Sequence, residues 1–275
     1  MRIVNHKLEG DGQAVPFVES PNVGGALQAD LLIMHFTAGS DAASSIESLT
    51  DPAAKASAHV VVGRDGAVTQ LVPFDRVAWH AGASQWQGRT GLNAYSIGIE
   101  LDNAGRLTRV GDHWESWFKR RYPDTEVIEA RHRNDPPGDT ASGWHDYTEA
   151  QIASAVALGR LLVTTYGLRD VLGHDDIAPR RKSDPGPAFP MASFHSRLVG
   201  RADGASQLFA TTASLNIRSG PGTEHATLKG SPLPKGATVN VLERNGLWWK
   251  VDVMATVRTV MDLVGWVHSR YLRVV

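Results

Sequence analysis

Two histidines and one aspartate in this sequence have the types and contexts of a catalytic zinc site. His35 follows the apolar run 31–34, which predicts a buried strand, and His174 follows a second strand-like stretch, 170–173. Asp184 lies in the polar, proline-rich loop after His174. Two imidazoles and one carboxylate leave the fourth tetrahedral position of zinc for water, which is the catalytic rather than the structural pattern. The chemistry indicated is hydrolysis, with one zinc ion per chain.

Two further side chains suit the proton transfers of such a reaction. Glu100 is the single acid in the short apolar segment 95–101, where desolvation raises a carboxyl pKa towards the working pH of a general base. Lys182, two residues before Asp184, can stabilise a negative charge that develops on oxygen. Each residue also has a structural interpretation. Glu100 can be a cap or an ion-pair partner, Lys182 can pair with Asp184, and a buried histidine such as His35 can be a hydrogen-bonded core residue.

The pattern of strands and helices expected around these side chains predicts an α/β domain over residues 1–200, with a mixed central sheet flanked by helices. Residues 55–72 have the pattern of a hairpin with an Asp-Gly turn. A capping signal at 148–151 begins a helix that runs to about Tyr166. Residues 104–145 are polar with no clear period, which predicts a lid or surface insertion. The aromatic residues of this stretch are expected at the surface or in the lid: His113, His132, His145, Trp114, Trp117 and Trp144.

Beyond residue 200 the pattern changes. Residues 201–207 are small and polar and predict a linker. Residues 208–275 contain short alternating runs separated by turns, with no helical period, and predict a small all-β barrel.

Composition excludes several classes of function. The 275 residues include 28 basic and 29 acidic side chains, a net charge of -1, so nothing favours a nucleic-acid partner. No cysteine is present, which excludes disulfides and thiol nucleophiles. The first residues contain no apolar signal-peptide core, and no apolar run has the length of a transmembrane segment. We therefore expect a cytoplasmic protein, or one delivered to the periplasm or cell wall by a signal-independent route. Removal of a leader and the oligomeric state stay open.

Three motifs carry a resemblance to a known family. They are Ala-Trp-His-Ala-Gly at 78–82, Asn93 with Ser-Ile-Gly-Ile-Glu-Leu at 96–101, and the segment 174–187. Together they resemble the zinc-dependent N-acetylmuramoyl-L-alanine amidases of the amidase and peptidoglycan-recognition superfamily, in particular the branch that recycles anhydromuropeptides. Some members of the superfamily place a catalytic tyrosine where this chain has Ala58, which agrees with the recycling branch. The tail 208–275 is similar to bacterial SH3 domains.

The resemblance implies hydrolysis of the amide between N-acetylmuramic acid and L-alanine, in peptidoglycan or soluble muropeptides, and a wall-binding role for the tail. The candidate substrate-binding residues are His80, Asn93, Arg89 and Arg181, the two arginines through stem-peptide carboxylates. His80 can instead pack on Trp79. A non-catalytic peptidoglycan receptor on the same fold is the alternative, although receptors of this kind usually lack a zinc ligand. Intact wall and soluble anhydromuropeptides both stay open as substrates.

Overall fold

The computed structural model describes residues 1–10, 15–136, 138–200, 208–254, 257–258, 260 and 263–275. These residues form two compact units, 1–191 and 192–275. Helix α4 (Met191–Val199) therefore groups with the C-terminal unit, whereas the sequence placed it in the first domain. The predicted linker 201–207 lies outside the described residues.

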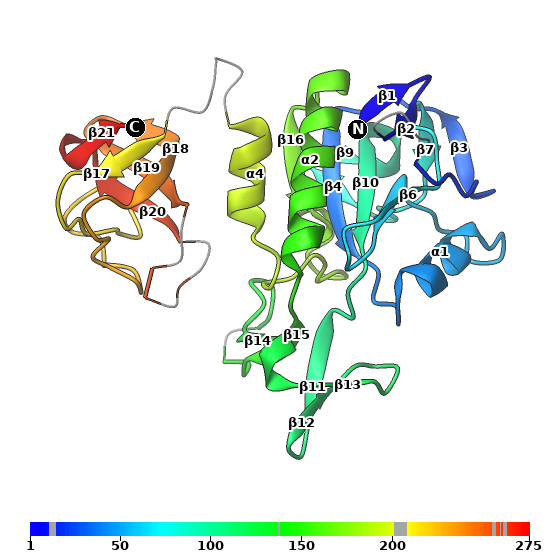
Figure 1. Cartoon of the computed structure of the whole chain (residues 1–275), viewed down its shortest axis with the longest axis horizontal. Coiled ribbons are helices and arrows are strands. Elements are labelled where there is room, and N and C mark those ends of the chain that lie inside the picture. The colour runs from blue at the N-terminus through cyan, green and yellow to red at the C-terminus, as the bar shows by residue number, and fades with distance from the viewer. Residues whose placement is uncertain (11–14, 137, 201–207, 255–256, 259, 261–262) are drawn as a thin grey trace. The chain divides into compact units, whose positions relative to one another are not determined.

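The N-terminal unit is built on a five-stranded mixed sheet with the order β16-β4-β10-β5-β6 (Figure 1). The first four strands are parallel and β6 is antiparallel to β5. A parallel sheet that is buried on both faces requires continuous apolar strands, as the run before His35 indicated. The strand bounds are β4 (Leu31–Phe36), β5 (Val60–Val62), β6 (Val68–Gln70), β10 (Ser96–Leu101) and β16 (Asp170–Gly173).

Three helices of this unit pack on or follow that sheet: α1 (Ala42–Thr50), α2 (Glu149–Tyr166) and α3 (His174–Ile177). Helix α2 crosses one face of the sheet (Figure 1) and begins with the predicted capping box, in which Thr148 and Gln151 bond each other's backbone N–H. It ends at Gly167, whose left-handed backbone terminates the helix. The predicted α2 helix is confirmed.

Alternation along β4 assigns its two faces. Leu31 and Ile33 belong to a buried cluster with Leu172 and Ile177, and His35 points to the same face because it continues the two-residue period. Leu32 and Met34 point to the opposite face. In the parallel register Glu100 lies directly beside His35, so strand pairing alone brings the predicted base to the predicted ligand.

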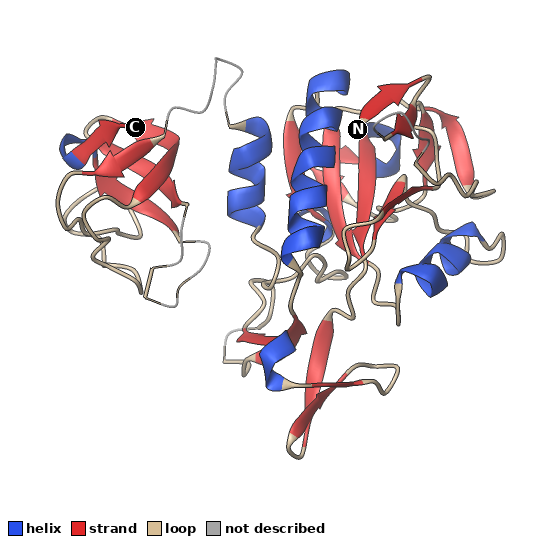
Figure 2. Cartoon of the chain, viewed as in Figure 1, coloured by secondary structure: helices blue, strands red, loops and turns tan. Residues whose placement is uncertain are grey.

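The insertion 104–145 forms a sheet of its own (Figure 2). Its strands pair in the antiparallel order β13-β12-β11-β15-β14. Its strands are β11 (Arg106–Val110), β12 (His113–Glu115), β13 (Arg121–Tyr122), β14 (Val127–Ala130) and β15 (Ser142–His145), with a short 3-10 helix, η2 (Asp124–Glu126). Of the aromatic residues expected at the surface or in the lid, four are buried within this inserted sheet: Trp114, Trp144, His132 and His145. Trp117 is exposed.

Smaller elements complete the N-terminal unit. Three two-stranded sheets pair β1 with β2, β3 with β7 and β8 with β9. Their bounds are β1 (Arg2–Val4), β2 (Lys7–Glu9), β3 (Val23–Ala26), β7 (Arg76–Ala78), β8 (Gln85–Trp86) and β9 (Arg89–Thr90), and the 3-10 helix η1 (Leu92–Tyr95) follows.

The C-terminal unit contains a five-stranded antiparallel sheet with the order β20-β19-β18-β17-β21, which confirms the predicted all-β character. Its elements are β17 (Phe209–Thr211), β18 (Thr238–Asn245), β19 (Trp248–Val253), β20 (Val264–His268), η3 (Ser269–Tyr271) and β21 (Leu272–Val274). Helix α4 is held to the sheet through Ser196, which donates to Asp252 and accepts from Asn240. Within the described residues of both units, no helix has the length and apolarity needed to cross a bilayer.

Candidate metal centre

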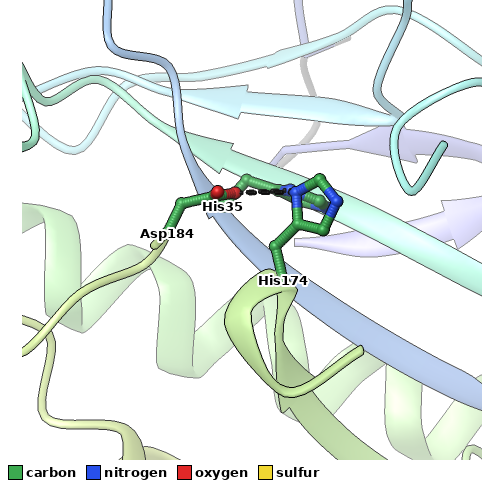
Figure 3. Close-up of side chains that lie close together, drawn as sticks. All are labelled: His35, His174 and Asp184. Carbon is green, nitrogen blue, oxygen red and sulfur yellow. Dashed lines mark hydrogen bonds and ion pairs between the residues drawn. The ribbon is translucent and has the colours of Figure 1, made fainter. Parts of the chain in front are cut away.

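The three predicted ligands meet at the carboxyl ends of two neighbouring parallel strands. His35 lies near the end of β4, His174 is the first residue of α3 directly after β16, and Asp184 lies on the loop that follows α3 (Figure 3). All three are at least 95% buried. Nδ1 of His35, Nδ1 of His174 and Oδ2 of Asp184 form a triangle with three sides of 2.9 Å. The fold therefore brings together residues that are up to 149 positions apart in sequence.

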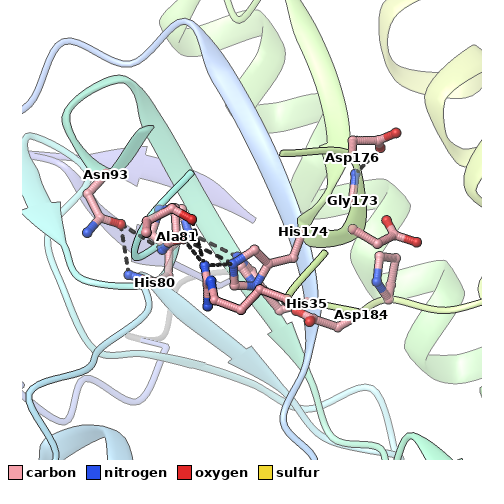
Figure 4. Close-up of polar contacts among 12 residues, drawn as sticks. His35, His80, Ala81, Asn93, Gly173, His174, Asp176 and Asp184 are labelled. Atoms are coloured by element: carbon pink, nitrogen blue, oxygen red, sulfur yellow. Dashed lines mark hydrogen bonds and ion pairs between the residues drawn. The ribbon is translucent and has the colours of Figure 1, made fainter. Parts of the chain in front are cut away.

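Hydrogen bonds to the outer ring nitrogens determine which histidine atoms carry protons. His174 Nε2 lies 3.1 Å from the carbonyl oxygen of Ala81 and must donate to it (Figure 4). In the neutral ring Nδ1 therefore carries no proton and presents a lone pair. His80 Nε2 likewise donates to the carbonyl of Ser96, so His80 Nδ1 accepts. His35 Nε2 lies 2.9 Å from His80 Nδ1 and is therefore the donor of that bond. His35 Nδ1 consequently also carries no proton and presents a lone pair.

Three electron pairs consequently face one another in a buried site. Burial, followed by the nearby His174, lowers the pKa of His35 to about 4, so the ring is neutral at physiological pH. Oδ2 of Asp184 lies 2.9 Å from both Nδ1 atoms and presents a third lone pair to them. Acceptors at 2.9 Å repel unless a cation lies between them. In a tetrahedral zinc site, bond lengths of about 2.0–2.1 Å place ligands about 3.3 Å apart. A small opening of this triangle fits that geometry.

Glu100, the neighbour of His35 across the parallel strands, lines a cavity of about 340 Å³. Its Oε2 is fully buried and has no hydrogen-bond partner among the described residues. Burial, reinforced by the charge of Asp184, raises the pKa of Glu100 to about 8, and the opposing charge of Lys182 lowers it. A carboxyl group with an unused buried oxygen and a pKa near neutrality has the properties of a general base. Lys182 is half-buried and close enough to act electrostatically on both Glu100 and His35.

His80 and Asn93, both predicted to bind substrate, support the centre from behind. His80 is 92% buried and orients His35 through the bond described above. Asn93 accepts hydrogen bonds from the backbone N–H groups of His80 and Ala81, at 3.1 and 2.7 Å, and so shapes the turn whose carbonyl orients His174. Both positions are those of residues that orient ligands, and such residues are an integral part of metal sites. Contact of either side chain with substrate stays a prediction.

The two predicted substrate-binding arginines have different surroundings. Arg89 Nη1 donates to both carboxylate oxygens of Asp30, at 2.8 and 3.0 Å, and the guanidinium lies over the ring of Tyr95, so it is already engaged. Arg181 is exposed, donates to the carbonyls of Ala81 and Ala83, and lines a second cavity of about 630 Å³. Of the two, only Arg181 lies next to the centre, 3.4 Å from His174 Nε2. Its contact with substrate is likewise a prediction.

The insertion contributes a support that the sequence did not indicate. His132 and Arg133 both bond the buried carboxylate of Asp175, and Asn134 donates to the backbone carbonyl of the same residue. Asp175 follows His174 directly, and its N–H donates to the carbonyl of Asp184 at 2.8 Å. The insertion thus holds the segment that carries two of the three ligands. The only signal in the sequence was the pair of adjacent acids after His174, one of which needs a partner if it is buried. The sequence gives no indication that this partner is His132.

Comparison with known proteins agrees with this geometry. A sequence profile of the family described as N-acetylmuramoyl-L-alanine amidase matches residues 25–187, more than half of the chain. The chain belongs to the N-acetylmuramoyl-L-alanine amidase family. A second profile, described as bacterial SH3 domain, matches residues 213–273. The amidase match includes the three ligands, Glu100 and Lys182, and the SH3 match lies in the C-terminal unit, so the predicted fold of each part is confirmed.

Two curated relatives illustrate the extent of the similarity. The chain is 37% identical over 142 residues to the 1,6-anhydro-N-acetylmuramyl-L-alanine amidase AmpD of Escherichia coli (strain K12), a match that covers 51% of this chain and 57% of that protein. It is 32% identical over 179 residues to the N-acetylmuramoyl-L-alanine amidase AmiD of the same strain, over 62% of this chain and 53% of that protein. The match thus spans little more than half of the length of either relative.

Solved structures of an AmpD protein and of E. coli AmiD are also similar to this chain. The structure of a selenomethionine derivative of AmpD has a TM-score of 0.49 and 27% identity, and the match covers 72% of this chain and 99% of that one. The E. coli AmiD structure, a complex with anhydro-N-acetylmuramic acid-L-Ala-D-gamma-Glu-L-Lys, has a TM-score of 0.47 and 31% identity, with 67% and 61% covered.

Proposed function

We propose that this chain is a zinc-dependent amidase that hydrolyses the amide between N-acetylmuramic acid and L-alanine. The observation that carries the proposal is the triangle of electron pairs from His35, His174 and Asp184, placed beside the unpartnered carboxyl of Glu100. The family membership and the activities for which AmpD and AmiD are named support the choice of bond. Zinc is the metal that best matches two imidazoles and one carboxylate in a compact buried site.

When bound, zinc supplies Lewis acidity, which polarises a carbonyl and lowers the pKa of water to about 7. Glu100 takes the proton of the attacking water as the new C–O bond forms. The ammonium group of Lys182 stabilises the negative oxygen of the tetrahedral intermediate. Glu100 then returns the proton to the departing nitrogen as the C–N bond breaks. The products are the lactyl carboxylic acid of the sugar and a peptide with a free L-alanine amine.

The decisive experiment separates metal binding, chemistry and fold. Purified protein should contain about one zinc ion and should release the peptide from an N-acetylmuramoyl tripeptide, as followed by mass spectrometry, until a chelator is added. His174→Ala should lose both zinc and activity. Glu100→Gln should keep zinc and lose roughly two to four orders of magnitude in rate. Glu129→Gln, the same change at an exposed position of β14, is the matched control and should keep full turnover.

Two results would contradict the proposal. Turnover by metal-free His174→Ala protein would exclude a metal mechanism, and near-native turnover by Glu100→Gln would move the base elsewhere. The receptor alternative predicts that wild-type protein binds the same muropeptide without cleaving it. The complete ligand set and the unpartnered Glu100 favour catalysis over that alternative.

We also propose that the C-terminal unit binds cell-wall polymer. Trp248, His268 and Tyr271 form a connected aromatic cluster, with ring centroids 5.4 and 5.9 Å apart, and Tyr271 is 42% exposed. Trp249 instead packs against Phe209 at the core. The first three rings are therefore available to a sugar or peptide ligand, whereas Trp249 serves the fold.

A further inference from the structure

The inserted sheet reaches the catalytic cavity through one turn. Between β12 and β13, the residues 116–120 turn towards the loop that follows β4. Trp117 Nε1 donates to the carbonyl of Ala38 at 2.7 Å, and Arg120 donates to the carbonyl of Ser40 at 2.5 Å. Ala38 has a positive φ of 53°, a conformation that a non-glycine residue keeps only where its surroundings hold it. The turn and the loop are therefore fixed against each other.

Trp117 is the most exposed large apolar side chain of the N-terminal unit among the described residues, at 72%. It lines the same 340 Å³ cavity as Glu100. Its indole N–H is used by Ala38, and Phe118 packs against it edge-on, with centroids 5.6 Å apart. The ring is thus anchored at its polar edge while most of its surface is open to solvent. An anchored, exposed indole beside a catalytic group has the features of a stacking surface for a flat apolar face.

The rest of this cavity is lined by α1 and the loop before it, and most of these residues carry hydroxyl groups, with Leu49 as an apolar neighbour. Thr37, Ser40, Ser44 and Ser48 line it, and Glu100 is its only ionisable lining residue. Ser40 and Ser44 bond each other at 2.9 Å, and Ser44 also bonds the backbone of Asp41 in the capping box of α1, so Ser40 is the member of the pair that keeps an acceptor lone pair for a further bond. The second cavity, lined by Arg180, Arg181 and Asp176, is by contrast charged. The two cavities therefore differ in the chemistry of the ligand that they suit.

We propose that the cavity between Trp117 and the serines of α1 binds a sugar ring of the glycan, with Trp117 as its stacking platform. This assignment rests on the proposed amidase function. A pyranose presents apolar C–H faces and peripheral hydroxyl groups, which match an indole on one wall and serines on the other. The stem peptide carries carboxylates, which the arginine-lined cavity suits better. The inserted sheet is then a sugar-recognition element, and the scissile amide lies between the two cavities.

Binding to an inactive enzyme tests the assignment separately from catalysis. In a zinc-loaded Glu100→Gln background, calorimetry compares an N-acetylmuramoyl tripeptide with a lactoyl tripeptide that lacks the sugar. Trp117→Ala should weaken binding of the sugar-containing ligand about tenfold and leave binding of the lactoyl peptide unchanged. Trp117→Phe, which keeps a ring, should retain most of the affinity. Val110→Ala, at an exposed position of β11 that does not line the cavity, is the matched control.

A second variant changes a residue of α1, on the other side of the cavity from Trp117, and therefore does not depend on the inserted sheet. Ser48 is exposed on α1, so Ser48→Tyr should fill the cavity without disturbing the fold and should weaken only the sugar-containing ligand. Equal loss for both ligands, or loss for neither, would overturn the assignment. Failure of the amidase proposal would give a different result, because the wild-type protein, which keeps Glu100, would bind zinc but not cleave the substrate. The binding comparison in the Glu100→Gln background would still be valid in that case.

Discussion

Replacing Glu100 with glutamine should stabilise the metal-free protein at alkaline pH. Burial, with the charge of Asp184 added, raises the pKa of Glu100 from its ordinary value of 4.5 to about 8. The folded chain therefore holds this proton more tightly than the unfolded chain does. Below pH 4.5 both states are protonated and the residue has no effect on stability. As pH rises from 4.5 to 8, the unfolded state is ionised first, and the folded state loses stability relative to it.

The size of the effect follows from the two pKa values. At 1.36 kcal/mol per pH unit, the interval from 4.5 to about 8 corresponds to about 5 kcal/mol. This is an upper bound, because Glu100 also borders the cavity while Oε2 is buried without a partner. We expect glutamine, which has no charge to desolvate, to raise the free energy of unfolding by about 2–3 kcal/mol at pH 9 and by less than about 1 kcal/mol at pH 5.

Urea unfolding of the chelator-treated full-length protein and of Glu100→Gln, at pH 5 and pH 9, measures this difference. The C-terminal unit is the same in both proteins, so its contribution cancels in the comparison. Zinc loading supplies the control, because a cation beside Glu100 favours the ionised form and should remove the advantage of glutamine. An advantage of the same size at both pH values, or a wild-type protein that is more stable at pH 9, would refute the reasoning.

Three further predictions follow from the same contacts. Gly98→Ala should weaken zinc binding and lower stability by about 1–3 kcal/mol, because its Cβ would lie 2.4 Å from the ring of His80; unchanged zinc titration and melting would contradict this packing. Lys182→Ala should reduce kcat by less than Glu100→Gln while zinc content is retained, and an equal or larger loss would assign Lys182 a greater role than charge stabilisation. Ending the chain at Met191 should remove the whole C-terminal unit and preserve cleavage of soluble muropeptides, with reduced retention on insoluble wall in a pull-down; equal retention would exclude wall binding by that unit.

Much of the site was predictable from sequence because its signals are local. His35 and His174 each follow an apolar strand, and parallel strands place their carboxyl ends at one edge. The sequence contains the signals for both ends of helix α2, the capping box at its start and Gly167 at its end. The role of His80 was not predictable, since the ring that it orients lies 45 residues earlier and only the fold brings them together. The cellular location stays a prediction.

The inserted sheet escaped prediction for a different physical reason. Its strands have two to five residues, too few to show an alternating pattern, and its core is provided by cross-strand partners such as Trp114 with Tyr122. Helix α4 groups with the C-terminal unit rather than with the first domain expected from the sequence, and its buried Ser196 has partners that lie 44 and 56 residues later. Polar side chains at such positions give no hydrophobic signal.

The contact of the insertion with Asp175 limits how this fold can be shortened by evolution or by engineering. A surface loop is usually exchanged freely, because only its two ends are fixed. Here, deletion of residues 132–134 would leave the buried carboxylate of Asp175 without its partners, directly beside a residue that faces the metal site. An uncompensated buried charge of this kind costs about 3–5 kcal/mol. A grafted or minimised amidase of this type must therefore either carry the segment 132–134 with it or replace Asp175 at the same time.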